Sequence, residues 1–187
     1  MDRIKSNHPD AKKYFLNALH SKKIIAYPTD TIYGIGTDAE NSKGINNINQ
    51  IKKRSQPMSV ILNDFSIIKN KLALDEVTLK KIEGILKDGS TCIAKCHRGS
   101  FNKLITKNDK IGFRIPNHLF LKSVLQLYNK PVTTTSINET GGKPLFCPDE
   151  IETKFGNQID LLVDDGVIKN DPSKIYMIDM NKIKRIR

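Results

Sequence analysis

Four short segments of the sequence carry the side chains that could do chemistry. The first, PTDTIYGIG, follows an apolar run and places Thr29, Asp30 and Thr31 where a strand is expected to end. Ligand-binding groups of α/β sheets usually lie at such strand ends. Gly34 and Gly36 would let the backbone pass close to a ligand. A capped turn that leads into a second strand explains the same residues without a ligand.

The second segment, IKKRSQP, places Lys52 and Arg54 two positions apart, near the end of an expected helix. If the chain is extended there, both side chains point to the same side. Together they can bind a triphosphate, with the lysine as a point charge and the arginine as a planar fork. In a chain this basic, a K-x-R sequence also arises by chance, so the pair alone favours a solvated surface.

The third and fourth segments are GFRIP and TTTSINETGG. The third puts Arg114 inside an apolar strand, and a buried arginine needs a partner, which is either a structural carboxylate or the carboxylate of a ligand.

The fourth is a threonine-rich strand that ends at Ser136 and Asn138, before the glycines Gly141 and Gly142. Hydroxyl, amide and backbone N–H groups at a strand end can hold a phosphate or a metal, and an Asx turn in a polar loop explains them equally well.

Metal and nucleophile chemistry have little support in the sequence. The four histidines show no metal-ligand spacing, and there is no G-x-S-x-G nucleophile elbow. The three cysteines form no zinc-binding pattern and are expected as small, buried, apolar side chains rather than as a disulfide framework. We therefore expect no metal site built from protein ligands.

Length and composition predict one domain that spans residues 1–187, with a sizeable core. No apolar run is long enough for a membrane span and the first residues do not form a secretory signal, so a cytoplasmic protein is expected. The formal charge of +11 favours an anionic ligand, without choosing among ATP, tRNA and phosphate. A lysine-rich solvated surface explains much of the same charge.

Helices and strands that alternate along the chain must position the four segments. Apolar spacing predicts a helix from about Pro9 to Leu19, and Asp64, Asp75 and Asn117 are candidate caps of later helices. Several strands adjoin without a helix between them, and both the Gly-rich dinucleotide turn and the P-loop are absent. The sequence therefore predicts an α/β fold with a twisted, mixed, open sheet flanked by helices. The other expected helices are 42–53, 65–71, 76–87, 117–128 and 148–155, and the expected strands are 23–28, 58–62, 90–96, 110–116, 131–136, 159–163, 174–180 and 183–187.

Taken together and in this order, the segments resemble the YrdC-like family, the threonylcarbamoyl-AMP synthases. The family pattern runs P-T-[DE]-T-x-Y-G-[IL]-G, K-x-R before P-[LM], R-[IVM]-P, [ST]-S-x-N followed by a small residue and a glycine, D-G-G or a similar sequence, and a late S-T-[IV]. This chain has PTDTIYGIG, KKRSQPMSVIL, GFRIP, TSINETG, VDDG and PSKIYMID, over about residues 10–180. It departs from the pattern in three places: the loop after Arg54 is shorter, KDGSTC replaces W-P-G-P-x-T, and Lys174 follows Ser173 where a hydroxyl is usual.

The resemblance implies a reaction that joins L-threonine, bicarbonate and ATP into threonylcarbamoyl-AMP and pyrophosphate, with Mg²⁺ accompanying the ATP. A separate transferase complex would then use the product to modify tRNA next to the anticodon, and the synthase itself would contact tRNA weakly if at all. Carried over position by position, the threonine-binding residues would be Thr31, Arg114, Thr134 and Ser173, the nucleotide-binding residues Arg54, Gln56, Lys110 and Ser136, and the residues of the reacting centre Lys52, Arg54, Ser136 and Asn138.

Two alternatives remain open at this point. The first is an RNA-binding module on the same scaffold without synthase activity, which the charge favours. Tight, salt-dependent RNA binding without binding of ATP or threonine would identify it. The second is a related carbamoyl-transfer domain, which the resemblance associates with larger chains that carry acylphosphatase and zinc-finger parts. The presence of both K-x-R and S-x-N together with Arg114 favours the synthase.

Overall fold

The computed structural model of the chain describes residues 1–53, 55–179 and 182–187. Within these ranges, ten strands form one open sheet in the order β1-β8-β2-β3-β7-β4-β6-β5-β9-β10. The sheet is mixed, since β4 pairs in parallel with β6 and antiparallel with β7. The predicted α/β class with a mixed open sheet is confirmed. The strands are β1 Asp2–Lys5, β2 Ile25–Tyr27, β3 Gly34–Gly36, β4 Ser59–Ile61, β5 Thr91–Lys95, β6 Lys110–Arg114, β7 Val132–Ser136, β8 Leu161–Asp164, β9 Ile175–Asp179 and β10 Lys182–Arg185.

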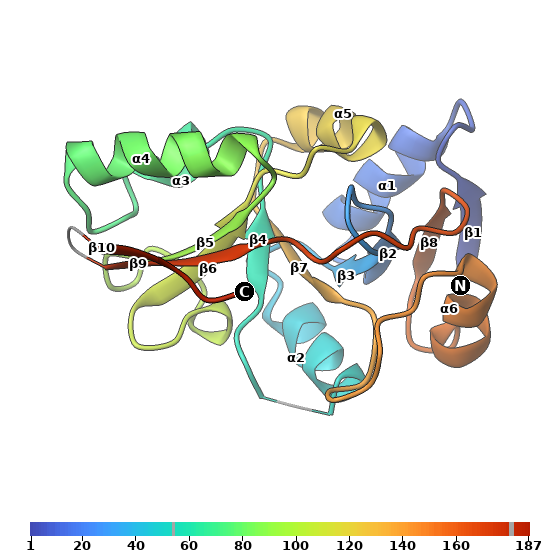
Figure 1. Cartoon of the computed structure of the whole chain (residues 1–187). Coiled ribbons are helices and arrows are strands. Elements are labelled where there is room, and N and C mark those ends of the chain that lie inside the picture. Colours follow the sequence, from blue (N-terminus) through green and yellow to red (C-terminus); the bar gives the residue numbers. More distant parts are fainter. Residues whose placement is uncertain (54, 180–181) are drawn as a thin grey trace.

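Helices flank the sheet and bury its apolar side chains (Figure 1). Helix α4 packs on β5, α1 on β2 and β8, and α2 on β3. None of the described helices is long and apolar enough to cross a membrane. The helices are α1 Ala11–His20, α2 Ser42–Ile51, α3 Ser66–Lys69, α4 Glu76–Lys87, α5 Leu119–Tyr128 and α6 Pro148–Phe155, with a short 3-10 helix, η1, at Lys103–Ile105.

Two apolar clusters divide the core. One joins α1 and α5 to the strand face that carries Ile25, Tyr27 and Ile61. The other joins α2, α3 and α4 to the opposite strand face, which includes Val60 and Phe113. Because neighbouring residues of a strand point to opposite faces, Ile61 and Val60 belong to different clusters. The α1–α5 cluster covers only part of its face, and this leaves the ends of β6 and β7 open for a site.

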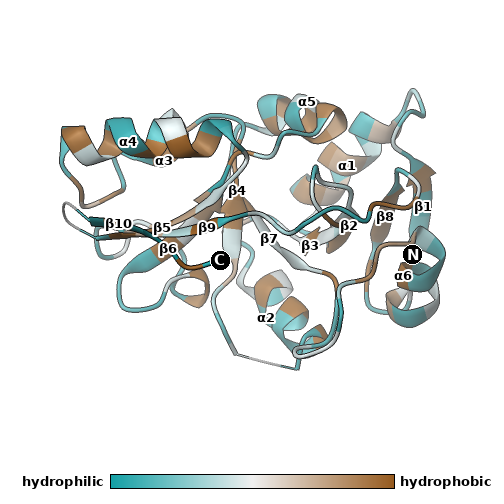
Figure 2. Ribbon diagram, viewed as in Figure 1, coloured by the Kyte–Doolittle hydropathy of each residue, from teal (hydrophilic) through white to brown (hydrophobic). Residues whose placement is uncertain are grey.

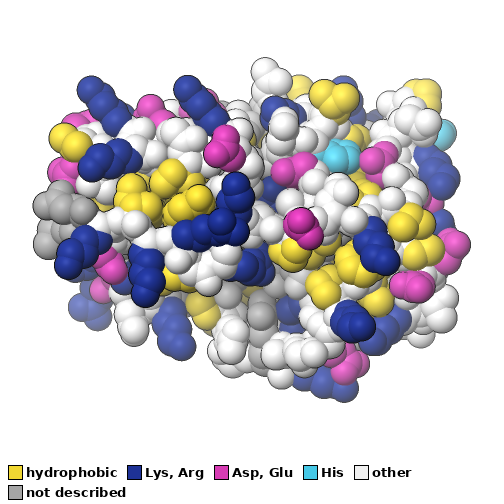
Figure 3. Space-filling view, in the orientation of Figure 1, with side chains coloured by type: hydrophobic (Ala, Val, Ile, Leu, Met, Phe, Trp, Pro, Cys, Tyr) yellow, Lys and Arg dark blue, Asp and Glu magenta, His cyan; other side chains and the backbone are white. Residues whose placement is uncertain are grey.

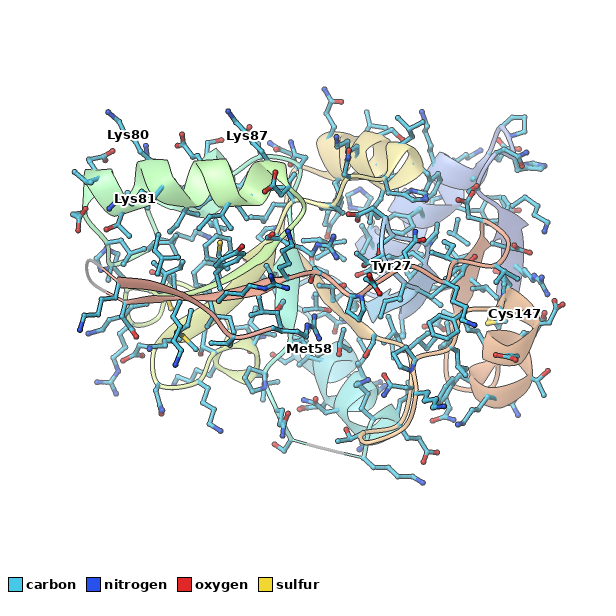
Figure 4. All side chains as sticks on the ribbon, in the orientation of Figure 1. Tyr27, Met58, Lys80, Lys81, Lys87 and Cys147 are labelled. Carbon is cyan, nitrogen blue, oxygen red and sulfur yellow. The ribbon has the colours of Figure 1, made fainter. Side chains whose placement is uncertain are left out.

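Helix α4 illustrates how the sequence specifies an element. The Asp75 side chain accepts a hydrogen bond of 2.8 Å from the Thr78 backbone N–H and caps the first turn. Buried Leu79, Ile82 and Leu86 recur at helical spacing and face the sheet. The helices accordingly show alternating hydrophobic and hydrophilic segments in Figure 2. In Figure 4, Lys80 and Lys87 project from the outer side of α4, away from the sheet.

Most predicted elements are present, and α4 and α6 have the predicted bounds. The prediction that Asn117 caps α5 is wrong, because the cap is His118, whose side chain accepts from the Leu121 N–H. The sequence did not predict β1, and it gave β3 only in the alternative of a capped turn that leads into a second strand, which the antiparallel pair of β2 and β3 confirms. Strand β1 is short and mostly exposed, and it is fixed by pairing with β8 and by Arg3 and Lys5, which both donate to Asp164 Oδ2.

Strand β3 consists of Gly34, Ile35 and Gly36, a composition that disfavours a strand. The reason for Gly36 lies in the packing, since a Cβ there would lie 1.8 Å from the Thr133 carbonyl oxygen. The sequence suggested that both glycines let the backbone approach a ligand. Gly34 lines a cavity, whereas Gly36 is not among the residues that line it and instead packs against β7.

Candidate active site

A cavity of about 290 Å³ lies on the open part of the sheet. Met58, which Figure 4 labels near the start of β4, is one of its lining residues. Figure 3 shows Lys and Arg side chains gathered near the middle of the drawn face. Among the residues that the sequence nominated, the cavity is lined by Thr31, Arg114, Thr134, Ser136 and Ser173.

Arg114 is the buried cation of this cavity. It is the last residue of β6, lies opposite Ile61 and Thr91 in the neighbouring strands, and is only 6% exposed. Its Nη2 donates to both carboxylate oxygens of Asp30, at 2.9 and 2.8 Å, and its Nη1 donates to Thr31 Oγ1 at 3.1 Å. Burial lowers the pKa of the guanidinium, and the charge of Asp30 opposes that effect.

The sequence left two partners open for Arg114, and the structure supplies one of them. Asp30 is a structural carboxylate, yet the guanidinium still lines the cavity. The Nε of Arg114 is buried and has no hydrogen-bond partner within the described part of the chain. Nη1 carries two N–H groups, and the one that does not donate to Thr31 Oγ1 is the donor that suits the carboxylate of a small ligand.

Thr29 sets the direction of the Thr31 hydroxyl. Thr29 Oγ1 donates to the Ile32 carbonyl at 2.7 Å and lies 2.9 Å from Thr31 Oγ1. A hydroxyl has one proton to donate. Because that of Thr29 goes to Ile32, Thr31 is the donor in any hydrogen bond between the two hydroxyls, and Thr29 Oγ1 also accepts from the Thr31 and Ile32 backbone N–H groups at 3.1 and 3.3 Å. Thr31 Oγ1 itself accepts from Arg114 and keeps a lone pair for a ligand.

Lys52 lies behind the cavity and holds the end of β7. It follows α2 directly and its side chain is almost completely buried. Its Nζ donates to the Ser136 carbonyl at 2.6 Å, the Asn138 carbonyl at 2.8 Å and Asn138 Oδ1 at 2.9 Å. Ser136 Oγ donates to the same Oδ1 at 2.6 Å. Lys52 of the predicted K-x-R is thus connected to both residues of the predicted S-x-N, and the Ser136 hydroxyl is the member that reaches the cavity.

The lining residues that were not predicted as site residues include Thr91 and Arg187. The Thr91 hydroxyl lies 2.9 Å from the Ser173 hydroxyl, and Arg187 Nε donates to the Ser173 carbonyl at 3.1 Å. Lys174, which stands where the resemblance expects a hydroxyl, is exposed, so the second hydroxyl at this point comes from Thr91. Only the pairing of β5 with β6 and β9 brings Thr91 here, and no local pattern distinguishes Arg187 from the neighbouring basic residues.

Two nominated nucleotide-binding residues, Gln56 and Lys110, do not line this cavity. A third, Arg54, lies outside the described residues. Gln56 is exposed and adjoins Pro57, which lines the cavity. Lys110 begins β6, on the same side of the strand as Arg114 but about 13 Å along it, and pairs with Asp179 at 2.7 Å. Their nucleotide contacts stay predictions.

Metal ligands and reactive thiols are not evident in the described residues. No group of three or more His, Cys, Asp or Glu within the described ranges is arranged to hold a metal ion. The three cysteines are free, and Cys92 and Cys96 are buried, as predicted. Burial raises the pKa of the Cys92 thiol to about 12, so this thiol stays protonated at neutral pH.

Comparison with known proteins identifies the family. The family model Sua5_yciO_yrdC, which carries the description "Telomere recombination", matches residues 17–187. The chain therefore belongs to the Sua5/YciO/YrdC family, and the predicted resemblance is confirmed. A protein from Methanocaldococcus jannaschii, provisionally named a threonylcarbamoyl-AMP synthase, is 33% identical over 179 residues, which cover 94% of this chain and 82% of the relative. The threonylcarbamoyl-AMP synthase of Photorhabdus laumondii is 28% identical over 165 residues, which cover 86% of this chain and 87% of that protein.

Solved structures show the same fold. Escherichia coli YciO matches with a TM-score of 0.86 at 19% identity, and the match covers 100% of this chain and 92% of YciO. P. abyssi Sua5, in a crystal structure with L-threonine, matches with a TM-score of 0.86 at 17% identity. That match covers all of this chain but only 56% of the Sua5 chain.

Proposed function

We propose that the protein is a threonylcarbamoyl-AMP synthase, which condenses L-threonine, bicarbonate and ATP. The observation that carries this proposal is the buried Arg114 guanidinium, paired with Asp30 and Thr31 and facing a small cavity rimmed by hydroxyl groups. The names of the relatives support the synthase and not the RNA-binding alternative.

The geometry gives each threonine-site residue a task. The Arg114 guanidinium binds the amino-acid carboxylate, because a fork of N–H donors matches two carboxylate oxygens. Thr31 accepts a hydrogen bond from the substrate's amine or hydroxyl. Thr134 and Ser173 supply further hydroxyls on the cavity wall. These contacts hold the amine in one orientation, which is the main contribution of such a site to rate.

The chemistry needs no covalent enzyme intermediate. The threonine nitrogen forms a bond to the bicarbonate carbon and water leaves, which gives a carbamate. A carbamate oxygen then forms a bond to the α-phosphorus of ATP, and pyrophosphate leaves. Ser136, fixed by Lys52 and Asn138, would contact the reacting phosphate, while Arg54 and Arg187 would offset negative charge on the triphosphate.

ATP extends beyond the cavity in this proposal. A volume of about 290 Å³ is at the small end of ligand pockets, which are roughly 300–1,000 Å³, and suits the amino acid and the reacting phosphate. The remainder of the nucleotide would lie on the open sheet toward Gln56 and Lys110. Mg²⁺ enters with ATP as part of the substrate, bound mainly by phosphate oxygens and water.

The product would serve tRNA modification. A separate threonylcarbamoyl transferase complex would move the group to the adenosine next to the anticodon. The formal charge of +11 favours a weak direct contact with tRNA. The cytoplasm, where ATP and tRNA meet, stays the predicted location.

The test is pyrophosphate release from Mg-ATP by the purified protein, with and without L-threonine and bicarbonate. We expect release only when both co-substrates are present, and its loss in Arg114→Ala. Arg98→Ala, which removes an exposed arginine away from the cavity, is the matched control and should behave as the unchanged protein. Pyrophosphate release that does not depend on threonine contradicts threonine as the substrate. Salt-sensitive RNA binding without any release would support the RNA-binding alternative.

A further inference from the structure

The turn between α4 and β5 lies directly behind the Arg114 site. Gly89 follows the C-cap residue of α4, has a φ of +68° and is buried. A Cβ at this position would lie 2.9 Å from Asp30 Oδ2 and 3.4 Å from Arg114 Nη2. The Asp30–Arg114 ion pair therefore fits tightly against the backbone of Gly89, which belongs to the KDGSTC segment and was given no role by the sequence analysis.

Asp30 is held from other sides as well. Both of its carboxylate oxygens accept from Arg114 Nη2, and its backbone carbonyl accepts from Asn170 Nδ2 at 3.1 Å. The Asn170 N–H donates to the Thr31 carbonyl at 3.2 Å, so the segment between β8 and β9 is fastened to the same loop. Figure 1 shows this segment crossing the sheet on its way to β9. Asp30 is not among the residues that line the cavity, so it acts on a ligand through Arg114.

We propose that Asp30 and Gly89 are positioning residues for the threonine carboxylate, an inference that rests on the proposed function. Asp30 fixes one arm of the Arg114 fork and compensates its charge. Gly89 provides the space in which the Asp30 carboxylate can stand beside the guanidinium. A buried guanidinium without its carboxylate partner would shift toward other acceptors or water. A shift of about 1 Å in a substrate-binding group can cost on the order of 100-fold in rate.

Two glycine variants separate this role from backbone strain. Gly89→Ala places a methyl group against Asp30 and also strains a positive φ. Gly99→Ala strains a similar φ of +81°, but nothing lies within 4 Å of its added Cβ. Alanine has a comparable steric cost at both positions, because both have a left-handed backbone conformation. The difference between the two variants therefore reports the contact with the ion pair.

The measurement is threonine-dependent pyrophosphate release, with separate KM values for threonine and ATP. We expect Gly89→Ala to raise the threonine KM by about 10- to 100-fold while the ATP KM changes little. Gly99→Ala should leave both KM values unchanged. Asp30→Ala should raise the threonine KM in the same way. Adding Gly89→Ala to Asp30→Ala should then have a much smaller effect than Gly89→Ala alone, because the colliding carboxylate is gone.

The outcomes are distinct. Equal threonine KM values in Gly89→Ala and Gly99→Ala, with an active parent protein, overturn the positioning role but leave the proposed function intact. Additive effects of Gly89→Ala and Asp30→Ala also overturn it. If Gly89→Ala does not fold, the Asp30→Ala variant provides the test. A threonine KM of Asp30→Ala equal to that of the parent protein refutes the proposal. Threonine-independent release by the parent protein removes the proposed function and this inference together.

Discussion

Replacing Lys52 with methionine tests whether this lysine holds the site together. Methionine keeps a similar length and removes the ammonium group. Three oxygens then lose the Lys52 donor, but Asn138 Oδ1 keeps the hydrogen bond from the Ser136 hydroxyl. The Ser136 and Asn138 carbonyls are the two acceptors to count, and a buried acceptor left without a partner costs about 1–3 kcal/mol. Because the cavity lies next to Ser136 and water can enter from it, we expect the lower part of that range for each, about 2–3 kcal/mol in all.

Lys53→Met is the matched control. Lys53 is the next residue, its side chain is 71% exposed, and it forms an ion pair with Glu139 at 3.1 Å. Exposed ion pairs contribute at most about 1 kcal/mol. Urea unfolding, followed by circular dichroism, gives the free energy of unfolding of both variants and the parent protein.

The expected result is a large loss of stability in Lys52→Met and almost none in Lys53→Met. Pyrophosphate release should fall in Lys52→Met even below its unfolding range, because Ser136 and Asn138 are no longer held. A difference below about 1 kcal/mol between the two variants would refute the calculation. Loss of activity with unchanged stability would instead place Lys52 in direct contact with the phosphates.

Three further predictions concern the site and its supporting strand. Arg114→Lys should weaken threonine binding about 10- to 100-fold in calorimetry, because an ammonium cannot serve both Asp30 and a ligand carboxylate as a fork does; equal affinity would contradict that reasoning. Thr29→Val should raise the threonine KM, because the Thr31 hydroxyl loses its acceptor, whereas Thr29→Ser should keep the KM of the parent protein. Equal threonine KM values in the two variants would refute the role of the Thr29 hydroxyl. Burial would raise the pKa of Asp164, but hydrogen bonds from Lys5, the Gly166 N–H and Arg3 lower it overall. The ionised Asp164 therefore contributes its full stabilisation above about pH 4, the pKa of an aspartate in the unfolded chain. This contribution is lost as the pH falls through the lower pKa of the folded state. The difference in free energy of unfolding between the parent protein and Asp164→Asn should therefore shrink when urea titrations are done at acid pH.

Local patterns in the sequence specified much of the fold. The Asp75 cap and the apolar spacing of α4 predicted this helix with its bounds. The strands β4 to β7 were predicted from runs of apolar and β-branched residues. Strand β1 was not predicted and β3 appeared only as an alternative, because charged residues and glycines carry no strand signal of their own. Their partners in the sheet, β8 and β7, decide that they are strands.

The candidate site divides in the same way. The ordered motifs nominated Thr31, Arg114, Thr134, Ser136 and Ser173, and the fold brings all five to one cavity. That Arg114 binds a ligand carboxylate stays a prediction, whereas its pairing with Asp30 is a finding of the structure. Gln56 and Lys110 remain predicted nucleotide contacts, and Arg54 lies outside the described residues.

The sequence by itself determined which residue types stand at the strand ends and in what order. Helical spacing, caps and motifs are local properties, and neighbouring residues suffice to specify them. The tertiary structure decided which of these side chains meet. Lys52 reaches Asn138 across 86 positions, and Thr91 reaches Ser173 across 82. Gly89 is behind Arg114 only because β5 and β6 pair in one register, and such pairing between distant segments is set by the packing of the whole sheet.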